Sequence, residues 1–477
     1  MVPAKAPGHF RSASEFAAHL RTVVADWAID EELEVDGPLA QPVEVHGRTL
    51  SNRFACHPME GWDGTADGRP TELTLRRWGN FGRSGAALVW GGEAFAVQRD
   101  GRANHRQLYL DPGVDVAATL AALLDALRSG ARACGDRGDE PLVGLQLTHS
   151  GRFSRPDGPP APLLAHRHPQ LAAKYPQTLD APVLTDGELE AIGENYVRAA
   201  ELAQQAGFDF VDVKMCHGYL LHELLGARQR EGAYGGSFEG RTRLFERVVA
   251  GIRRACPGLH IGVRVSLADT VPFEKDPETR VGRPMACDGP YTHGFGVDAL
   301  DPICFDLREP FRLLQRFEQL GIELVNVTLG SPYHNPHLQR PAAYPPSDGY
   351  LPPDDPLVFV KQHLDVVRAA RMAAPKLKLV GTAYTYLQEW LSHSGQREVR
   401  DGHVDFVGVG RMLLSYPELC RDVLAGRAVQ RKRICRTFSD CTTGPRNGMI
   451  SGCFPLDPHY KAMPEAAKVK QLRDGAR

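Results

Sequence analysis

Cationic, imidazole, amide and glycine residues follow a series of short apolar segments in this chain. They stand in the runs His57-Pro58-Met59-Glu60, Gly91-Gly92-Glu93, Gln146-Leu147-Thr148-His149, Lys214-Met215-Cys216-His217, Arg264-Val265-Ser266, Gly381-Thr382 and Gly408-Val409-Gly410-Arg411. Strand ends without a function would carry a mixture of small polar residues. If the fold gathers these runs on one face, their side chains can bind a polar ligand and transfer protons.

The last two of these runs indicate a phosphate site. Glycine lets backbone N–H groups approach a phosphate closely, and Gly381, Thr382 and Gly410 supply such positions. Arg411 adds a guanidinium that can donate two hydrogen bonds to phosphate oxygens. The spacing therefore favours an enzyme with a phosphorylated ligand.

The segments before these runs predict strands, and longer amphipathic segments separate them. We expect strands at 54–59, 87–92, 143–147, 208–214, 261–266, 324–328, 377–381 and 404–409, and the clearest helices at 117–128, 186–205, 238–255 and 356–373. Eight strand–helix alternations predict an α/β fold, a (β/α)8 TIM barrel with long loops at its C-terminal face. A doubly wound sheet is the rival, but no GxGxxG turn follows the first strand.

Three regions divide the chain. Residues 1–45 form an N-terminal extension that should cap the barrel bottom or lie along its side, 46–427 form the barrel, and 428–477 form an irregular Cys-containing tail. The Pro- and Gly-rich segments 267–308 and 331–355 follow the fifth and sixth strands. Loops in these places lie at the catalytic mouth of a barrel, so we expect both to form walls of the substrate pocket.

Composition excludes several classes of protein. The 477 residues carry a formal net charge of −2, so no overall field attracts nucleic acid or an anionic membrane. No segment approaches the roughly 18 apolar residues of a membrane span, and the N-terminus lacks a secretory pattern. We expect a cytoplasmic protein with a small-molecule substrate and reduced cysteines; homo-oligomerisation remains open.

Five ordered motifs resemble the Old Yellow Enzyme family of NAD(P)H:flavin oxidoreductases. They are "LSNRFACHPMEGWDGTADGRPTE", "GLQLTHSGR", "HGYLLHELLGARQREGAYGGSFEGRTRLFERVVAGIR", "IGVRVS" and "FVGVGR", in the family's order and over about residues 45–425. The resemblance implies an FMN-binding barrel that uses NADH or NADPH as reductant. It is nearer the dienoyl-CoA reductase and trimethylamine dehydrogenase branch, without that branch's second domain.

The resemblance also implies roles for single residues. Gln146 matches the amide at the polar edge of the flavin ring, and Arg264 matches the cation beside N1 and the C2 carbonyl, where it favours the reduced, anionic ring. Tyr219 matches the proton donor. The remaining cofactor positions are Pro58, Met59, Glu60 and Gly92 along the ring and Gly381, Thr382, Gly410 and Arg411 at the phosphate end.

Two positions depart from the family pattern. Lys214-x-x-His217 replaces the usual His-x-x-His or His-x-x-Asn pair that binds the substrate oxygen, although an ammonium still stabilises an enolate oxygen. Glu60 replaces the usual Thr or Cys near the ring. A carboxylate there would disfavour reduced flavin, so we expect Lys214 and Glu60 to form an ion pair, with solvent exposure of Glu60 as the alternative.

The leading functional hypothesis is reduction of an activated C=C bond of an enone or enoyl substrate. Lys214 and His217 would hold the carbonyl oxygen, and Tyr219 would protonate the α-carbon. The altered pair keeps a second hypothesis open, oxidation or demethylation of an amine or alicyclic substrate. Less favoured are a Schiff-base aldolase built on Lys214 and a non-catalytic flavin-binding module.

The cysteines of the tail leave metal binding open. Members of the iron–sulfur branch carry a Cys-x2-Cys-x3-Cys-x11-Cys run. Here Cys441-x11-Cys453 has the last spacing and Cys435 lies upstream, but Ile434 and Thr437 occupy the expected first two positions. A cluster needs four thiolates, and Cys420 could supply the fourth only in a different geometry. Unliganded thiols are favoured over an iron–sulfur cluster or zinc.

Overall fold

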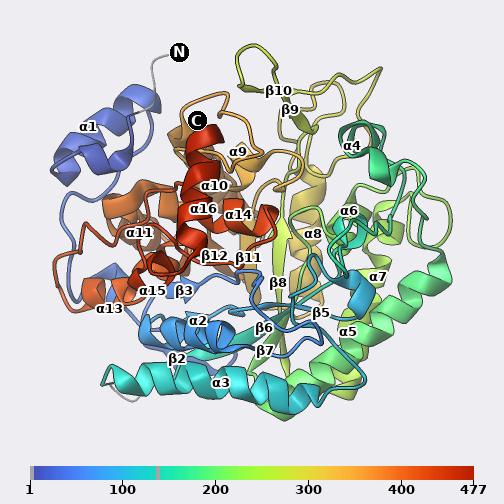
Figure 1. Cartoon of the computed structure of the whole chain (residues 1–477), viewed down its shortest axis with the longest axis horizontal. Coiled ribbons are helices and arrows are strands. Elements are labelled where there is room, and N and C mark those ends of the chain that lie inside the picture. The colour runs from blue at the N-terminus through green and yellow to red at the C-terminus, as the bar shows by residue number, and fades with distance from the viewer. Residues whose placement is uncertain (1–4, 136–139, 477) are drawn as a thin grey trace.

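Eight parallel strands close into a barrel at the centre of the molecule (Figure 1). The computed structural model describes residues 5–135 and 140–476. Around the ring the strands are β3 Phe54–Cys56, β4 Leu88–Val89, β6 Leu142–Thr148, β7 Phe210–Val213, β8 His260–Ser266, β11 Leu324–Thr328, β12 Lys378–Gly381 and β13 Phe406–Val409, and β13 pairs again with β3. The predicted (β/α)8 barrel is confirmed, and each strand lies within or beside its expected segment.

Helices cover the outside of the barrel. They are α2 Glu72–Arg83, α3 Val116–Ala133, α5 Asp186–Ala206, α7 Phe238–Ala255, α8 Arg308–Gln319, α10 Pro356–Ala373, α11 Leu391–Arg400 and α13 Leu419–Leu424. Local sequence explains their limits: α5 begins with a capping box between Thr185 and Glu188 and ends at Gly207, whose φ of 96° suits glycine. The bounds of α7 and α10 are those predicted.

The N-terminal extension covers both the bottom and one side of the barrel. A hairpin of β1 (Val43–Val45) and β2 (Arg48–Leu50) packs against the first residues of several strands, including Leu88, Leu142 and Phe210. Helix α1 (Ala13–Val23) lies beside α10 instead. The bottom is therefore closed by apolar packing, which leaves the opposite end for a site.

Shorter elements occupy the loops at that opposite end. They are β5 Ala94–Ala96, α4 Pro169–Lys174, α6 Leu220–Leu225, β9 Phe273–Lys275, β10 Gly282–Pro284, α9 Pro336–Gln339 and α12 Met412–Ser415. No helix in the described ranges is long and apolar enough to cross a membrane.

The tail contains three helices and lies over the barrel mouth. These are α14 Asp440–Arg446, α15 Pro458–Lys461 and α16 Glu465–Ala476, red in Figure 1. Ser451 Oγ accepts a hydrogen bond from the backbone N–H of Trp62 at 3.0 Å, and Asp457 pairs with Arg76 at 2.8 Å. Because both partners follow β3, the tail is fixed to the end of the barrel that carries the polar runs.

Candidate functional site

A cavity of about 470 Å³ opens at the C-terminal ends of the strands. Its lining includes most of the residues singled out from the sequence: Pro58, Met59, Glu60, Gln146, Lys214, His217, Tyr219, Arg264, Thr382, Gly410 and Arg411. Two predicted positions lie outside it among the described residues. Gly92 instead accepts a hydrogen bond at its carbonyl from Arg77, and Gly381 packs against Tyr384. The volume falls in the usual range of about 300–1,000 Å³ for small-molecule sites.

A buried aspartate on β7 organises the inner wall. Asp212 accepts hydrogen bonds from Gln146 Nε2 at 2.6 Å, from Trp90 Nε1 at 2.7 Å and from the backbone N–H of Arg264 at 2.7 Å. Burial raises the pKa of Asp212, and these donors oppose that shift. The carboxylate thereby fixes the side-chain amide of Gln146 and the backbone at Arg264. The sequence signal was a charged residue inside an otherwise apolar strand, and our sequence reasoning missed it.

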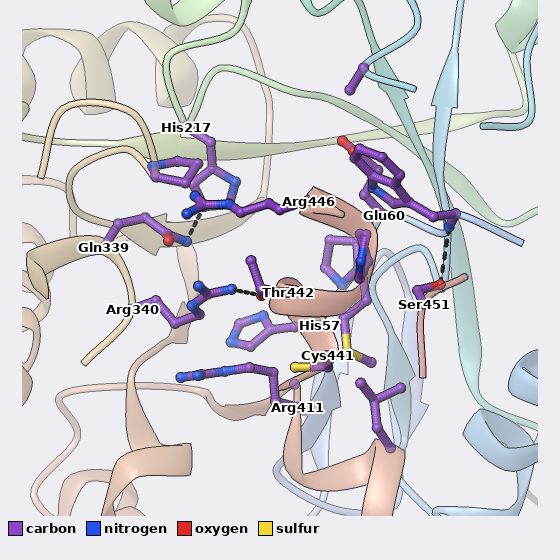
Figure 2. A pocket seen from close by; sticks show the side chains of 18 of the residues that line it. His57, Glu60, His217, Gln339, Arg340, Arg411, Cys441, Thr442, Arg446 and Ser451 are labelled. Atoms are coloured by element: carbon purple, nitrogen blue, oxygen red, sulfur yellow. Dashed lines mark hydrogen bonds between the residues drawn. The ribbon is translucent and has the colours of Figure 1, made fainter. Parts of the chain in front are cut away.

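Two guanidinium groups meet at the other end of the cavity (Figure 2). Arg411 donates to the carbonyl of Pro341 at 3.2 Å, and Arg340 donates to Thr442 Oγ1. Burial, and then the charge of Arg411, lowers the pKa of Arg340 to about 9. Arg340 was not predicted, because it stands in a loop without a motif. Two neighbouring, partly buried cations form a site that suits a dianionic phosphate.

Position 408 on β13, beside the end of the cavity that holds the two guanidinium groups, has room only for glycine. A Cβ on Gly408 would lie 2.1 Å from Nε2 of His57 and 2.4 Å from the carbonyl oxygen of Gly381. His57 is fixed from the other side, since its Nδ1 lies 3.0 Å from Nδ2 of Asn326. The strand β13 can therefore pass close to β3 only with Gly408 in place.

Tyr219, Glu60 and Lys214 form one cluster, in an arrangement that differs from our expectation. Tyr219 donates a hydrogen bond to Glu60 Oε2 at 2.7 Å, and the Lys214 ammonium lies 4.1 Å from the centroid of the Tyr219 ring. No ion pair joins Lys214 to Glu60 in the part of the chain that the structure describes, so the expected contact is wrong. The tyrosine hydroxyl and the face of its ring satisfy the two charges separately.

Burial sets the protonation of this cluster. Burial, and then the charge of Glu60, raises the pKa of Tyr219 well above its usual value. Burial lowers the pKa of Lys214, with nearby thiol and carboxylate groups opposing the shift. At neutral pH Tyr219 therefore holds its proton, which a proton donor requires.

His217 is held in a strained conformation at the same end. Its φ is 65°, and its backbone N–H donates to Ser266 Oγ at 3.3 Å. Such a conformation costs about 1–3 kcal/mol in a residue other than glycine and is typical of functional positions. Nε2 of His217 lies 3.2 Å from Nε2 of Gln339, a second residue that sequence reasoning missed (Figure 2). Burial keeps the His217 pKa well below its usual value, so the ring is neutral.

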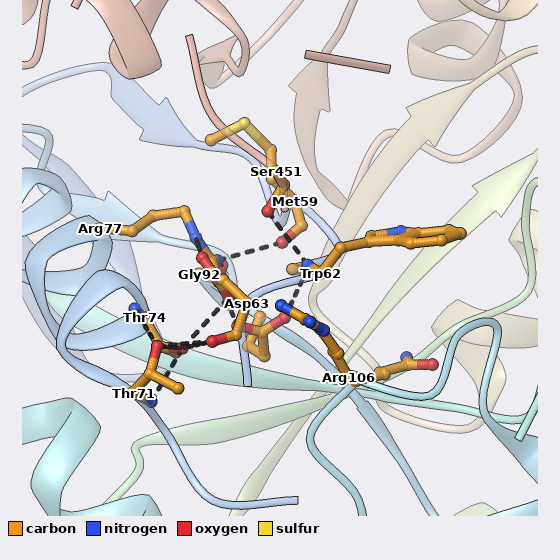
Figure 3. A network of polar contacts seen from close by, with 12 residues as sticks. Met59, Trp62, Asp63, Thr71, Thr74, Arg77, Gly92, Arg106 and Ser451 are labelled. Carbon is orange, nitrogen blue, oxygen red and sulfur yellow. Dashed lines mark hydrogen bonds and ion pairs between the residues drawn. The ribbon is translucent and has the colours of Figure 1, made fainter. Parts of the chain in front are cut away.

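A buried ion network positions the loop that carries Glu60 (Figure 3). Arg77 on α2 pairs with Asp63 and with Glu93, each at 2.8 Å, and also donates to the carbonyl of Met59 at 3.4 Å. These charged side chains are almost fully buried. Arg77 therefore ties the loop after β3 to the end of β4, which explains why charged residues occupy a buried place beside the site.

Several segments form the walls, and one of the two that we expected is among them. Residues Pro332, Tyr333, Gln339, Arg340, Pro341 and Asp348 of the segment 331–355 line the cavity, as expected. None of the described lining residues belongs to 267–308, so that expectation is wrong. The other walls include the segment after β3, from Trp62 to Phe81, the segment after β6, from Arg152 to Gln177, and the tail. The ring of Phe153 stacks on Tyr333 with centroids 3.4 Å apart.

The segment 267–308 instead lines a smaller cavity of about 20 Å³. Five histidines meet there, His166, His168, His222, His293 and His334, together with Asp269. Asp269 Oδ2 lies 3.0 Å from His334 Nδ1 and 3.8 Å from His222 Nδ1. Burial lowers the pKa of His222 to about 4 and that of His166 to about 3, so these two rings are neutral behind the wall of the main cavity.

The tail cysteines lie beside the phosphate end. Cys441 lines the cavity near Arg411, and the thiols of Cys435 and Cys441 help burial to raise the pKa of Cys453. The described residues contain no group of three or more His, Cys, Asp or Glu side chains arranged to hold a metal ion.

The donors of the cavity fit a flavin mononucleotide. Arg264 Nε and Arg411 Nη1 are buried and have no hydrogen-bond partner among the described residues, so both are free for a ligand. The paired guanidinium groups suit the phosphate, and the amide of Gln146 suits the alternating donors and acceptors of the ring edge. Gln146, Arg264, Arg340 and Arg411 would therefore hold the group.

Comparisons with known proteins agree with this geometry. The model of the NADH:flavin oxidoreductase / NADH oxidase family matches residues 38–280. An NADPH dehydrogenase of Geobacillus sp. (strain WCH70) is 30% identical over 246 residues, which cover 49% of this chain and 64% of the relative. An NADPH dehydrogenase of Listeria monocytogenes serotype 4b (strain CLIP80459) is 28% identical over 379 residues, which cover 78% of this chain and 90% of the relative.

Solved structures share the fold. A 2-naphthoyl-CoA reductase has a TM-score of 0.66 at 17% identity, over 90% of this chain and 58% of that one. A morphinone reductase has a TM-score of 0.54 at 20% identity, over 83% of this chain and 92% of that one. The chain thus spans 64% of the Geobacillus relative and little more than half of the naphthoyl-CoA reductase.

Proposed function

The chain belongs to the NADH:flavin oxidoreductase / NADH oxidase family, and on this premise we propose that it is an FMN-dependent enzyme that reduces an activated C=C bond with NADH or NADPH. The observation that carries the proposal is the cluster of Tyr219, Lys214 and His217 in the same cavity as the flavin-binding donors. When bound, FMN supplies a ring that accepts hydride from the nicotinamide and returns it to the substrate.

The chain's own residues would hold the cofactor at two ends of the cavity. Arg340 and Arg411 neutralise the phosphate, and Gln146 and Arg264 bind the polar edge of the ring. The hydrogen bonds of Asp212 support this role, because they hold the amide of Gln146 and the backbone at Arg264 before the cofactor arrives. A preorganised cation also favours the negative charge of a reduced ring without reorganisation during the reaction.

Three side chains act on the substrate. Lys214 and neutral His217 stabilise the oxygen of the substrate as negative charge develops there, an effect worth about 2.7–4 kcal/mol per donor in comparable sites. Tyr219 Oη gives its proton to the α-carbon. Its hydrogen bond to Glu60 and its 3.5 Å contact with the Tyr333 hydroxyl support this role, because they offer a route for a new proton.

Oxidation of an amine is the second candidate, and Glu60 is the observation in its favour. A carboxylate that accepts a hydrogen bond from Tyr219 can also take up a proton that leaves a substrate. The charge of the cavity opposes this candidate, because its lining carries more cations than carboxylates and an ammonium substrate would be repelled. This repulsion does not oppose the oxidation of a neutral alicyclic substrate, because that substrate carries no positive charge.

The test follows deuterium from the nicotinamide. The FMN-loaded protein is supplied with NADPH deuterated at C4 and with cyclohex-2-enone in the absence of oxygen. We expect cyclohexanone with deuterium at the β-carbon, and loss of turnover in Tyr219→Phe. Flavin reduction without a saturated product would contradict the proposal, and trapping of Lys214 by borohydride and a ketone would indicate the aldolase instead.

A further inference from the structure

The walls of the main cavity carry an excess of positive charge. Of its described lining residues, nine are cationic, and the carboxylates are Glu60, Asp348 and Asp457. Three cations are neutralised by close ion pairs: Arg76 by Asp457, Arg77 by Asp63 and Glu93, and Arg152 by Glu223. Six cations remain, Arg155, Lys214, Arg264, Arg340, Arg411 and Arg446, against Glu60 and Asp348.

The cofactor neutralises only part of this excess. Six cations against two carboxylates leave a formal charge of +4, and the second carboxylate of the Arg77 network lowers it to +3. The phosphate of FMN brings about −2, so about +1 is left on the walls. A substrate with a single negative charge neutralises this remainder, whereas a dianion would reverse it. The walls therefore favour an anionic substrate over a cationic one, and a monoanion over a dianion.

Two of the cations lie at the mouth, on the side of Tyr333. Arg446 extends from α14 across the cavity (Figure 2), and Arg155 lies on the segment after β6. Both guanidinium groups act on the same phenol, since their charges oppose the effect of burial on the pKa of Tyr333. Tyr333 in turn contacts Tyr219. Arg155 follows Phe153, whose ring stacks on Tyr333, so both cations line the side of the cavity that holds Tyr333.

Neither cation is held by a strong partner. The side chain of Arg155 is exposed and forms no ion pair in the described part of the chain. Arg446 pairs with Asp348, whose side chain is 58% exposed. An exposed pair of this kind contributes only about 0–1 kcal/mol, so a carboxylate that enters the mouth can replace Asp348 at little cost.

Resting on the proposed reductase function, we propose that the substrate carries a carboxylate, which Arg446 and Arg155 bind at the mouth while its double bond lies beside Tyr219. Arginine suits this task because its planar fork donates two parallel hydrogen bonds to a carboxylate. The tail therefore contributes to substrate selection, since Arg446 belongs to α14.

The experiment compares an acid with its neutral ester. trans-4-Oxopent-2-enoate and its methyl ester share one activated double bond and differ in charge. With NADPH and the FMN-loaded protein we expect a higher kcat/KM for the acid. Arg446→Gln and Arg155→Gln should each lower kcat/KM for the acid about 10-fold, as expected for a hydrogen bond to a charged group. The ester should change less than about twofold, and Arg446→Lys, which keeps the charge without the planar fork, should retain only part of the preference.

Controls separate the possible failures. Arg308→Gln removes an 88% exposed cation on α8, outside the cavity, and should leave the preference unchanged. A wild type that reduces acid and ester equally would overturn the carboxylate site while the reductase proposal stands. If neither is reduced, calorimetric titration of both into FMN-loaded wild type and the double variant still decides. If the wild type binds the acid and the variant with both Arg446→Gln and Arg155→Gln does not, the site is supported. If the wild type binds acid and ester equally, the site is overturned.

Discussion

Arg340 offers the sharpest test of the phosphate end, because no sequence motif identified it. Its guanidinium is partly buried beside Arg411, donates to Thr442 and has a pKa lowered to about 9. In the protein without cofactor the two cations repel each other, and a bound phosphate removes that repulsion. Arg340→Met should therefore weaken FMN binding by the value of a charge-assisted hydrogen bond, about 1.5–3 kcal/mol or roughly 10- to 150-fold in Kd.

Riboflavin is the matched ligand for this prediction, since it lacks only the phosphate. Fluorescence titration of flavin-free protein should show weaker FMN binding in Arg340→Met and an unchanged Kd for riboflavin. Arg312→Met, an exposed cation on α8, should change neither. Equal losses for FMN and riboflavin would refute the reasoning, because they would indicate a general collapse of the loop.

Three further predictions concern the rest of the site. Tyr219→Phe should slow reoxidation by an enone about 100- to 10,000-fold in stopped-flow measurements, while flavin reduction by NADPH stays near the wild-type rate. A variant that keeps the wild-type rate in both half-reactions would exclude Tyr219 as proton donor. Arg77→Met leaves Asp63 and Glu93 buried without their cation, so the free energy of unfolding should fall by about 3–5 kcal/mol. The loss should be larger at pH 8 than at pH 5, because burial raises the pKa of Glu93 and its protonation removes one of the unpaired charges; a pH-independent change in urea unfolding would contradict this account. Arg264→Met should lower the flavin reduction potential in spectroelectrochemistry, and an unchanged potential would remove Arg264 from the ring.

Much of the fold follows from patterns of local sequence. Buried parallel strands are continuous apolar runs, so all eight could be located, and the amphipathic segments between them gave the clearest helices. The ends of β7 and β8 gave Lys214, His217 and Arg264, because a closed barrel brings strand ends together whatever their separation in sequence.

The residues that were missed depend on contacts between distant loops. Arg340 and Gln339 belong to a loop whose position is set by the tail, through the hydrogen bonds of Thr442 and Thr437. The Lys214–Glu60 pair was expected from complementary charge alone. Sequence could not show that the ring of Tyr219 would lie between these groups and satisfy both.

The most direct measurement is the flavin content of the purified protein after incubation with FMN. Its visible spectrum, followed by acid precipitation and chromatography of the supernatant, should show about one FMN per chain released without a covalent bond, because Arg340, Arg411, Gln146 and Arg264 bind it only through charge and hydrogen bonds. A colourless protein that takes up no FMN, or flavin that remains with the precipitated chain, would contradict the account.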